Sequence, residues 1–265
     1  MEPLILLLTC GVLAGALSGL FGIGGGSLFV PVIYFYLNSV AGLDNDTALR
    51  SAIAHSLICV CFAAGLSAFL HWRHQHLAYP SLKRWWIPLV AGVALGVFFS
   101  SWLSSQALAA IFAGILLLAA ILLSKSEWLA RVKRSHAAKL IARWPSLEKL
   151  IAFIVGGLSS LAGIGAGSLG VPAMQIGGLS ASEASANASV LSLSIGLMAS
   201  FLAFILSWTG VPFHLDLVLA LGFGSLIGAP LGVKLHRALS NALLNKCFAS
   251  LLVLVALSIF YDLVT

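Results

Sequence analysis

The sequence predicts an all-α integral membrane protein, a polytopic bundle of two inverted-topology repeats. Each repeat has a glycine-broken re-entrant helical hairpin plus three transmembrane helices. Of its 265 residues, 60% are apolar and only 8% are charged, and the mean hydropathy is +1.08. A soluble domain carries about 25% charged residues, because water must wet its surface. The composition therefore excludes a cytosolic enzyme, a secreted module, a nucleic-acid binder and a disordered protein.

The membrane helices follow from the length of the apolar segments. A helix needs roughly 20 mostly apolar residues to cross a bilayer. By this measure we predict six full spans, at about residues 50–70, 86–103, 106–123, 184–206, 216–233 and 243–261. Two further apolar segments, 4–37 and 150–177, are cut by glycines, and their second arms are too short to cross. Broken backbone at membrane depth survives only where protein or a wet cavity satisfies it, so we expect a re-entrant hairpin in each.

The two interrupted segments are copies of one another. Residues 15–31 align with residues 156–172 at a constant offset of 141, and 12 of the 17 positions are identical. Farther on, Gly92 and Gly96 match Gly224 and Gly228 at an offset of 132. We therefore divide the chain into an N-terminal repeat (1–123), a linker (124–149) and a C-terminal repeat (150–265), which together form one domain.

The basic residues predict the orientation. All but one of the 14 Lys and Arg residues fall in three clusters, and Arg50 is the exception. The clusters are Arg73, Lys83 and Arg84; Lys125, Arg131, Lys133, Arg134, Lys139, Arg143 and Lys149; and Lys234, Arg237 and Lys246. Because cytoplasmic loops collect Lys and Arg, we place the clusters in the cytoplasm and both termini outside, in the periplasm. Loop 71–85 is then inside and its counterpart 207–215 outside, so the repeats are inverted, as is typical of secondary transporters.

The long polar segment lies between the repeats. Apolar residues recur at near-helical spacing over 125–147, with basic residues between them. This pattern predicts an amphipathic helix on the cytoplasmic face. A structural linker explains it better than a site for an anionic regulator.

The glycine-rich breaks carry the candidate binding site. Glycine lets the backbone turn tightly and lets a ligand approach closely. Unpaired N–H groups and the positive end of a helix dipole then attract an anion. The predicted substrate-binding residues here are Gly24, Gly25, Gly26, Ser27, Gly165, Ala166, Gly167 and Ser168. The alternative is that these glycines serve close packing of helices.

Polar residues within the spans are the other candidates. An ionisable group inside a membrane is a functional candidate, so His55 is a candidate for proton coupling, although a core histidine with satisfied hydrogen bonds is the alternative. Ser56, Asn187 and Ser189 are further substrate-binding candidates, with hydrogen bonding between helices as the alternative. Arg50 either pairs with Asp46 across one helical turn or guides anions at the outer mouth.

The sequence predicts no enzyme activity, catalytic residue, metal or cofactor. His71, His74 and His76 flank Arg73 at a membrane exit, which indicates juxtamembrane polarity rather than zinc. No Ser/His/Asp grouping is present that would support hydrolysis. The expected partners are a small anion and the lipid bilayer, without nucleic acid, and a monomer and a homodimer both remain open.

These motifs resemble those of the TauE/SafE family of sulfite exporter-like membrane transporters. The matching elements are residues 22–27 with Val30 and Pro31, and residues 163–168 with Val171 and Pro172. The resemblance covers essentially the whole chain. It implies export of sulfite or an organosulfonate across a bacterial inner membrane, coupled to the proton gradient.

The chain departs from the family at one point. Members often carry a Thr-Ser pair after an alanine in the helix that follows each hairpin. Here the nearest matches are Ala54-His55-Ser56 and Ala188-Ser189. A passive anion channel and an uptake permease for a sulfur oxyanion are the alternative functions.

Overall fold

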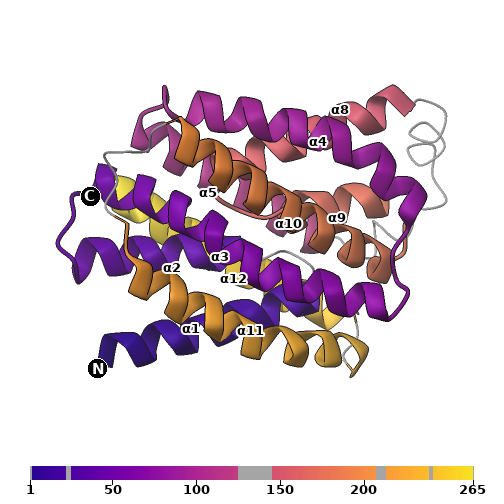
Figure 1. Cartoon of the computed structure of the whole chain (residues 1–265), viewed down its shortest axis with the longest axis horizontal. Coiled ribbons are helices and arrows are strands. Elements are labelled where there is room, and N and C mark those ends of the chain that lie inside the picture. Colours follow the sequence, from indigo (N-terminus) through magenta and orange to yellow (C-terminus); the bar gives the residue numbers. More distant parts are fainter. Residues whose placement is uncertain (1, 22–24, 125–144, 207–212, 239–240, 265) are drawn as a thin grey trace.

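The computed structural model describes residues 2–21, 25–124, 145–206, 213–238 and 241–264 (Figure 1). These residues form ten helices and no strand. The helices are α1 (Glu2–Phe21), α2 (Gly26–Ser39), α3 (Asn45–Arg73), α4 (Tyr79–Ser100), α5 (Ser105–Ser124), α8 (Pro145–Leu161), α9 (Gly167–Ile176), α10 (Ala181–Ile205), α11 (Leu215–Ala238) and α12 (Asn241–Val264). The all-helical prediction is thus confirmed for the described part of the chain. Most of the predicted amphipathic linker, 125–144, lies outside it.

Five of the six predicted spans are confirmed as helices long and apolar enough to cross a membrane. These are α3, α4, α5, α10 and α11. The sixth, 243–261, lies within the 24-residue helix α12, and its crossing of the membrane stays a prediction.

Large apolar side chains cover the outer surface of the bundle. Phe204 is 85% exposed, Trp102 77% and Ile87 71%. Exposed apolar surface on this scale marks contact with a membrane or a protein. The interior instead holds alanine, serine and glycine where helices meet.

The central helices α3 and α10 run antiparallel. A methyl group at Gly196 would lie 2.9 Å from the Leu57 carbonyl oxygen. Farther along α3 the Ser67 and Ser189 hydroxyls are 3.0 Å apart. Residues later in α3 therefore contact residues earlier in α10.

Backbone-to-backbone contact joins α1 to α11. A methyl group placed on Gly15 would lie 2.2 Å from the Ser225 carbonyl oxygen, and one placed on Gly228 would lie 1.9 Å from the Val12 carbonyl oxygen. Gly19 packs in the same way against Ala229, so the two helices run parallel. Small residues let membrane helices approach this closely.

The α4 and α8 helices repeat this packing. A methyl group at Gly92 would lie 2.0 Å from the Phe153 oxygen, and one at Gly156 would lie 2.2 Å from the Leu89 oxygen. In the division predicted from the sequence, α1 corresponds to α8 and α11 to α4 by helix order. The first helix of each predicted repeat is thus packed against the fourth helix of the other.

Candidate functional site

The second break is built on a glycine that ends α8. Gly163 has a φ of +67°, and its N–H donates to the Ser160 oxygen at 3.3 Å. The Ile164 N–H donates to the Ser159 oxygen at 2.9 Å. This is a Schellman motif, which satisfies the last carbonyls of a helix and favours glycine at the left-handed position. The chain then starts α9 after Ala166.

The first break is described from Gly25 onwards, so the predicted binding residue Gly24 lies outside the described residues. Gly25 has a φ of +75° and its oxygen accepts from the N–H groups of Leu28 and Phe29 at 3.0 and 3.1 Å. A methyl group here would lie 2.9 Å from the Phe29 ring. The conformation and the space both favour glycine.

The structure brings the two breaks into contact. A Cβ at Gly26 would lie 2.7 Å from Ile164 Cα, 2.8 Å from the Gly163 oxygen and 3.0 Å from the Gly165 nitrogen. Residues 25–27 and 163–168 around the contact are buried. Helices α2 and α9 therefore begin beside each other in the interior of the bundle.

Hydrogen-bond donors gather at this contact. The first N–H groups of α2 and α9 have no partner within their helices, and the helix dipoles place partial positive charge there. The hydroxyls of Ser27 and Ser168 are buried, and neither makes a hydrogen bond to a residue that the structure describes. A buried unbonded hydroxyl costs about 1–3 kcal/mol. The two serines occupy matching positions of the duplicated segment, 141 residues apart.

Ser56 holds the second break in place. Its hydroxyl lies 2.7 Å from the Gly163 oxygen and 2.8 Å from the Ile53 oxygen, and it donates to these carbonyls. The hydroxyl therefore fastens α3 to the turn. Its role as a substrate donor stays a prediction.

His55 is buried, and both of its ring nitrogens are engaged. Nδ1 lies 2.7 Å from the Ser51 oxygen, and Nε2 accepts from the His214 N–H at 2.9 Å. Because a carbonyl only accepts and an N–H only donates, these partners assign the proton to Nδ1 and a neutral ring. The ring also stacks on Phe213, with centroids 5.1 Å apart.

The predicted residues of α10 also bind protein groups. Asn187 accepts the Ala78 N–H at 3.0 Å and donates to the Ala78 oxygen at 3.1 Å. Ser189 donates to the Ser185 oxygen at 3.0 Å and lies 3.0 Å from the Ser67 hydroxyl. These bonds match the alternative of hydrogen bonding between helices, and substrate binding by either residue stays a prediction.

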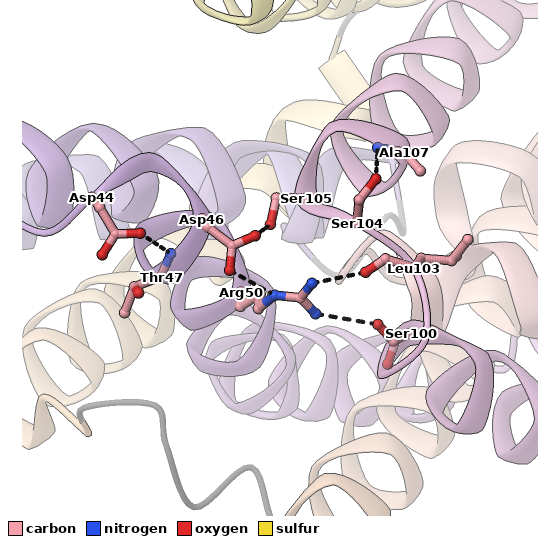
Figure 2. Close-up of polar contacts among 9 residues, drawn as sticks. All are labelled: Asp44, Asp46, Thr47, Arg50, Ser100, Leu103, Ser104, Ser105 and Ala107. Carbon is pink, nitrogen blue, oxygen red and sulfur yellow. Dashed lines mark hydrogen bonds and ion pairs between the residues drawn. The ribbon is translucent and has the colours of Figure 1, made fainter.

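Arg50 pairs with Asp46 at one end of the bundle (Figure 2). The Nε to Oδ2 distance is 3.2 Å, and Nη2 donates to the Leu103 oxygen at 2.8 Å. The Ser105 hydroxyl donates to Asp46. A cavity of about 320 Å³, lined partly by Asp46 and Tyr34, adjoins this cluster. Arg50 thus fastens α3 to the end of α4, as the pairing interpretation predicts.

Comparison with known proteins decides the family. A family model described as "Sulfite exporter TauE/SafE" matches residues 7–259. The chain belongs to the TauE/SafE family.

Named relatives support a membrane transporter rather than an enzyme. The chain is 24% identical to the probable membrane transporter protein YunE of Bacillus subtilis, over 97% of both chains. It is 26% identical to a probable membrane transporter protein of Haemophilus influenzae, over 97% of this chain and 98% of the other. It is 27% identical to one of Methanocaldococcus jannaschii, over 93% and 91%. No solved structure matches.

Sequence reasoning missed further buried hydroxyls in this TauE/SafE protein. Ser18 and Ser159, which share the offset of 141, are buried and, like Ser27 and Ser168, have no hydrogen-bond partner among the described residues. The same holds for Ser51 on α3 and Ser185 on α10. The signal was available for the first pair, because Ser18 and Ser159 are identical positions of the duplicated segment.

A second missed contact ties α8 to the start of α4. Glu148 accepts from Arg84 Nε at 2.8 Å and from Trp85 Nε1 at 2.9 Å. The partners are 63 and 64 residues apart, so no local pattern indicates the pairing.

The three histidines near Arg73 lie close together. The His76 ring centroid is 6.1 Å from that of His71 and 6.2 Å from that of His74. Within the described ranges, no group of three His, Cys, Asp or Glu side chains could hold a metal ion.

Proposed function

We propose that this TauE/SafE protein is a secondary transporter that exports sulfite or an organosulfonate by alternating access, coupled to the proton gradient. The observation that carries the proposal is the contact between the starts of α2 and α9, each with a buried, unbonded serine hydroxyl. The family description supports a sulfur anion as the substrate.

The chemistry of this contact suits an anion. Neither 4–37 nor 150–177 contains a Lys or Arg residue. Two helix N-termini and two hydroxyls instead supply several donors and partial positive charge, as half-helices do in transporters. Sulfite and sulfonate groups each present three acceptor oxygens. We assign Gly24, Gly25, Gly26 and Ser27, with Gly165, Ala166, Gly167 and Ser168, as the anion site.

The packing supports alternating access between two inverted repeats, 1–123 and 150–265. The corresponding helices α3 and α10 run antiparallel, as an inversion requires. The described residues of both breaks, 25–27 and 163–168, are buried, so substrate reaches them only when helices move. One group of helices would rock against the other.

The arrangement of helix ends supports a multi-pass orientation with basic loops in the cytoplasm. Both termini lie at one end of the bundle, and the α3–α4 connection and the start of α8 lie at the other (Figure 1). Arg73 ends α3 and Lys149 lies in the first turns of α8. The positive-inside rule then puts the termini in the periplasm of a bacterial inner membrane.

Replacement of the serines tests the site. A hydrogen bond to a charged group is worth about 1.5–3 kcal/mol, or roughly 10- to 150-fold in affinity. We expect Ser27→Ala and Ser168→Ala each to weaken sulfite binding by about tenfold or more, and the double variant by more than either. Binding is measured in proteoliposomes. Ser250→Ala, at an exposed serine of α12, is the matched control.

Unchanged affinity in the double variant would remove these hydroxyls from the site. A flux screen of sulfite, sulfate, thiosulfate, taurine and sulfoacetate identifies the substrate. Flux that never saturates and ignores a pH gradient would instead favour a passive anion channel. Net inward flux under an export gradient would favour an uptake permease.

A further inference from the structure

Each of the central helices α3 and α10 is tied by one contact to the start of a helix in the other predicted repeat. Asn187 of α10 binds the backbone of Ala78, which precedes α4. His55 of α3 binds the backbone of His214, which precedes α11. Because α3 corresponds to α10 and α4 to α11, the two contacts are reciprocal.

The two contacts lie at opposite ends of the bundle. His55 and Asn187 are each in the first half of their own helix, and these helices run antiparallel. The start of α4 is at the end of the bundle opposite the termini, and the start of α11 is at the end that holds them (Figure 1).

The two contacts differ in their response to protons. Neither the side-chain amide of Asn187 nor the backbone of Ala78 titrates near neutral pH. Nε2 of His55 accepts the His214 N–H only while it is unprotonated. A proton on Nε2 removes the acceptor and sets two N–H groups against each other. Nδ1 already donates to Ser51, so the ring has no other acceptor to offer.

The charges that act on His55 come from the start of α11. His214 and Asp216 are the titratable side chains there that act on His55, and the His214 ring centroid lies 6.1 Å from that of His55. Helices α2 and α5, which also pack against α3, contain no Asp, Glu, Lys, Arg or His. The other side chains of α3, α1, α10 and α11 that carry charge or titrate near neutral pH are Glu2, Asp46, Arg50, His71, Arg73, Glu183, Lys234, His236 and Arg237.

We propose that two contacts, His55 with His214 and Asn187 with Ala78, each hold one end of the bundle closed, and we call them the His55 latch and the Asn187 latch. Protonation opens only the His55 latch. A proton on His55 releases the start of α11 and opens the end that carries the termini. The consequence for transport rests on the proposed function. A proton that arrives from the periplasm opens the path to that side, so the anion leaves as the proton enters. Asn187 is the positioning residue that keeps the opposite end closed.

Hydrogen exchange of the full-length protein in lipid nanodiscs tests the latches. Rates are corrected for the intrinsic pH dependence of exchange. Between pH 8 and pH 5 we expect the protection of the His214 amide to fall at least tenfold. The Ala78 amide, held by Asn187, is the internal control and keeps its protection. A pH response at both amides, or at neither, overturns the proposal.

Two variants sharpen the test. His55→Gln offers an acceptor and a donor that do not titrate, so the His214 amide should stay protected at both pH values. Asn187→Ala should expose the Ala78 amide and leave the pH response of His214 intact. If protection of the His214 amide still depends on pH in His55→Gln, another group causes the effect and the His55 latch is wrong. Should a variant fail to fold, the wild-type measurement stands alone.

The outcome separates the latch from the transport function. If the His214 amide responds but no sulfur anion crosses proteoliposomes, the latch holds and the proposed function fails. If a pH gradient drives flux while the His214 amide is unresponsive, the function holds and the latch is wrong.

Discussion

In the first repeat the left-handed residue beside the break is Gly25, with a φ of +75°, whereas its counterpart Ala166 has a φ of −61°. In the second segment the left-handed residue is Gly163, with a φ of +67°, and its counterpart Gly22 lies outside the described residues. Matching positions of two segments that agree at 12 of 17 residues can thus differ in backbone conformation, as Gly25 and Ala166 do. An alanine fits at position 166 because its backbone is right-handed, and the same side chain at position 25 would be strained.

The largest expected effect is at the helix crossings, where the repeats are alike. Gly228→Ala puts a methyl group 1.9 Å from the Val12 oxygen, and its counterpart Gly96→Ala puts one 2.4 Å from the Gly157 oxygen. Neither backbone can yield without separating the helices, so we expect both variants to lose the folded, monodisperse protein in detergent, as seen by size-exclusion chromatography.

Gly157→Ala is the matched control for these crossings. It lies in the same α4 and α8 contact, but its methyl group would meet the nearest atom, the Gly92 oxygen, at 3.4 Å. We expect it to fold normally. Equal loss in all three variants would mean that the close backbone contact does not decide the outcome, since alanine is a better helix former than glycine.

An intermediate effect is expected at the breaks, where the repeats differ. Gly25→Ala places an L side chain in the left-handed region, which costs about 1–2 kcal/mol. Ala166→Gly relieves nothing and, because glycine is favoured over alanine at a helix N-cap, should cost less than about 0.5 kcal/mol. The melting temperature in detergent should therefore fall for Gly25→Ala and stay nearly unchanged for Ala166→Gly. Equal shifts would show that the two breaks share one conformation.

The smallest effect is expected at the starts of α3 and α10. α10 has a capping box of Ser180 and Glu183, whereas α3 has an Asp44 cap and the Arg50 to Asp46 pair. Because 28% of the Arg50 side chain and 59% of the Asp46 side chain are exposed, the pair is worth at most about 1 kcal/mol. Arg50→Gln should lower the melting temperature slightly, and added salt should shrink the difference from wild type. Lys83→Gln, at an exposed lysine, is the control, and a salt-independent loss would point to the carbonyl contacts of Arg50 instead.

The sequence predicts the helical membrane class, both breaks and six spans, of which the structure confirms five, because hydropathy and the duplication are properties of the chain itself. It does not predict that Gly25 turns left-handed, because glycine is compatible with either conformation. It names His55 and Asn187 as candidates but not their partners. Those partners, His214 and Ala78, lie 159 and 109 residues away and depend on how the helices pack.

The reciprocal burial of α1 against α11 has a consequence for biosynthesis. The glycine face of α1, formed by Gly11, Gly15 and Gly19, meets its partner only after residues 221–229 have been made. At about 5–20 residues per second, a nascent chain needs roughly 10–40 s to reach that point. During this interval α1 lies in the bilayer without α11. The glycine face of α1 must therefore be covered by something else, either lipid or the insertion machinery.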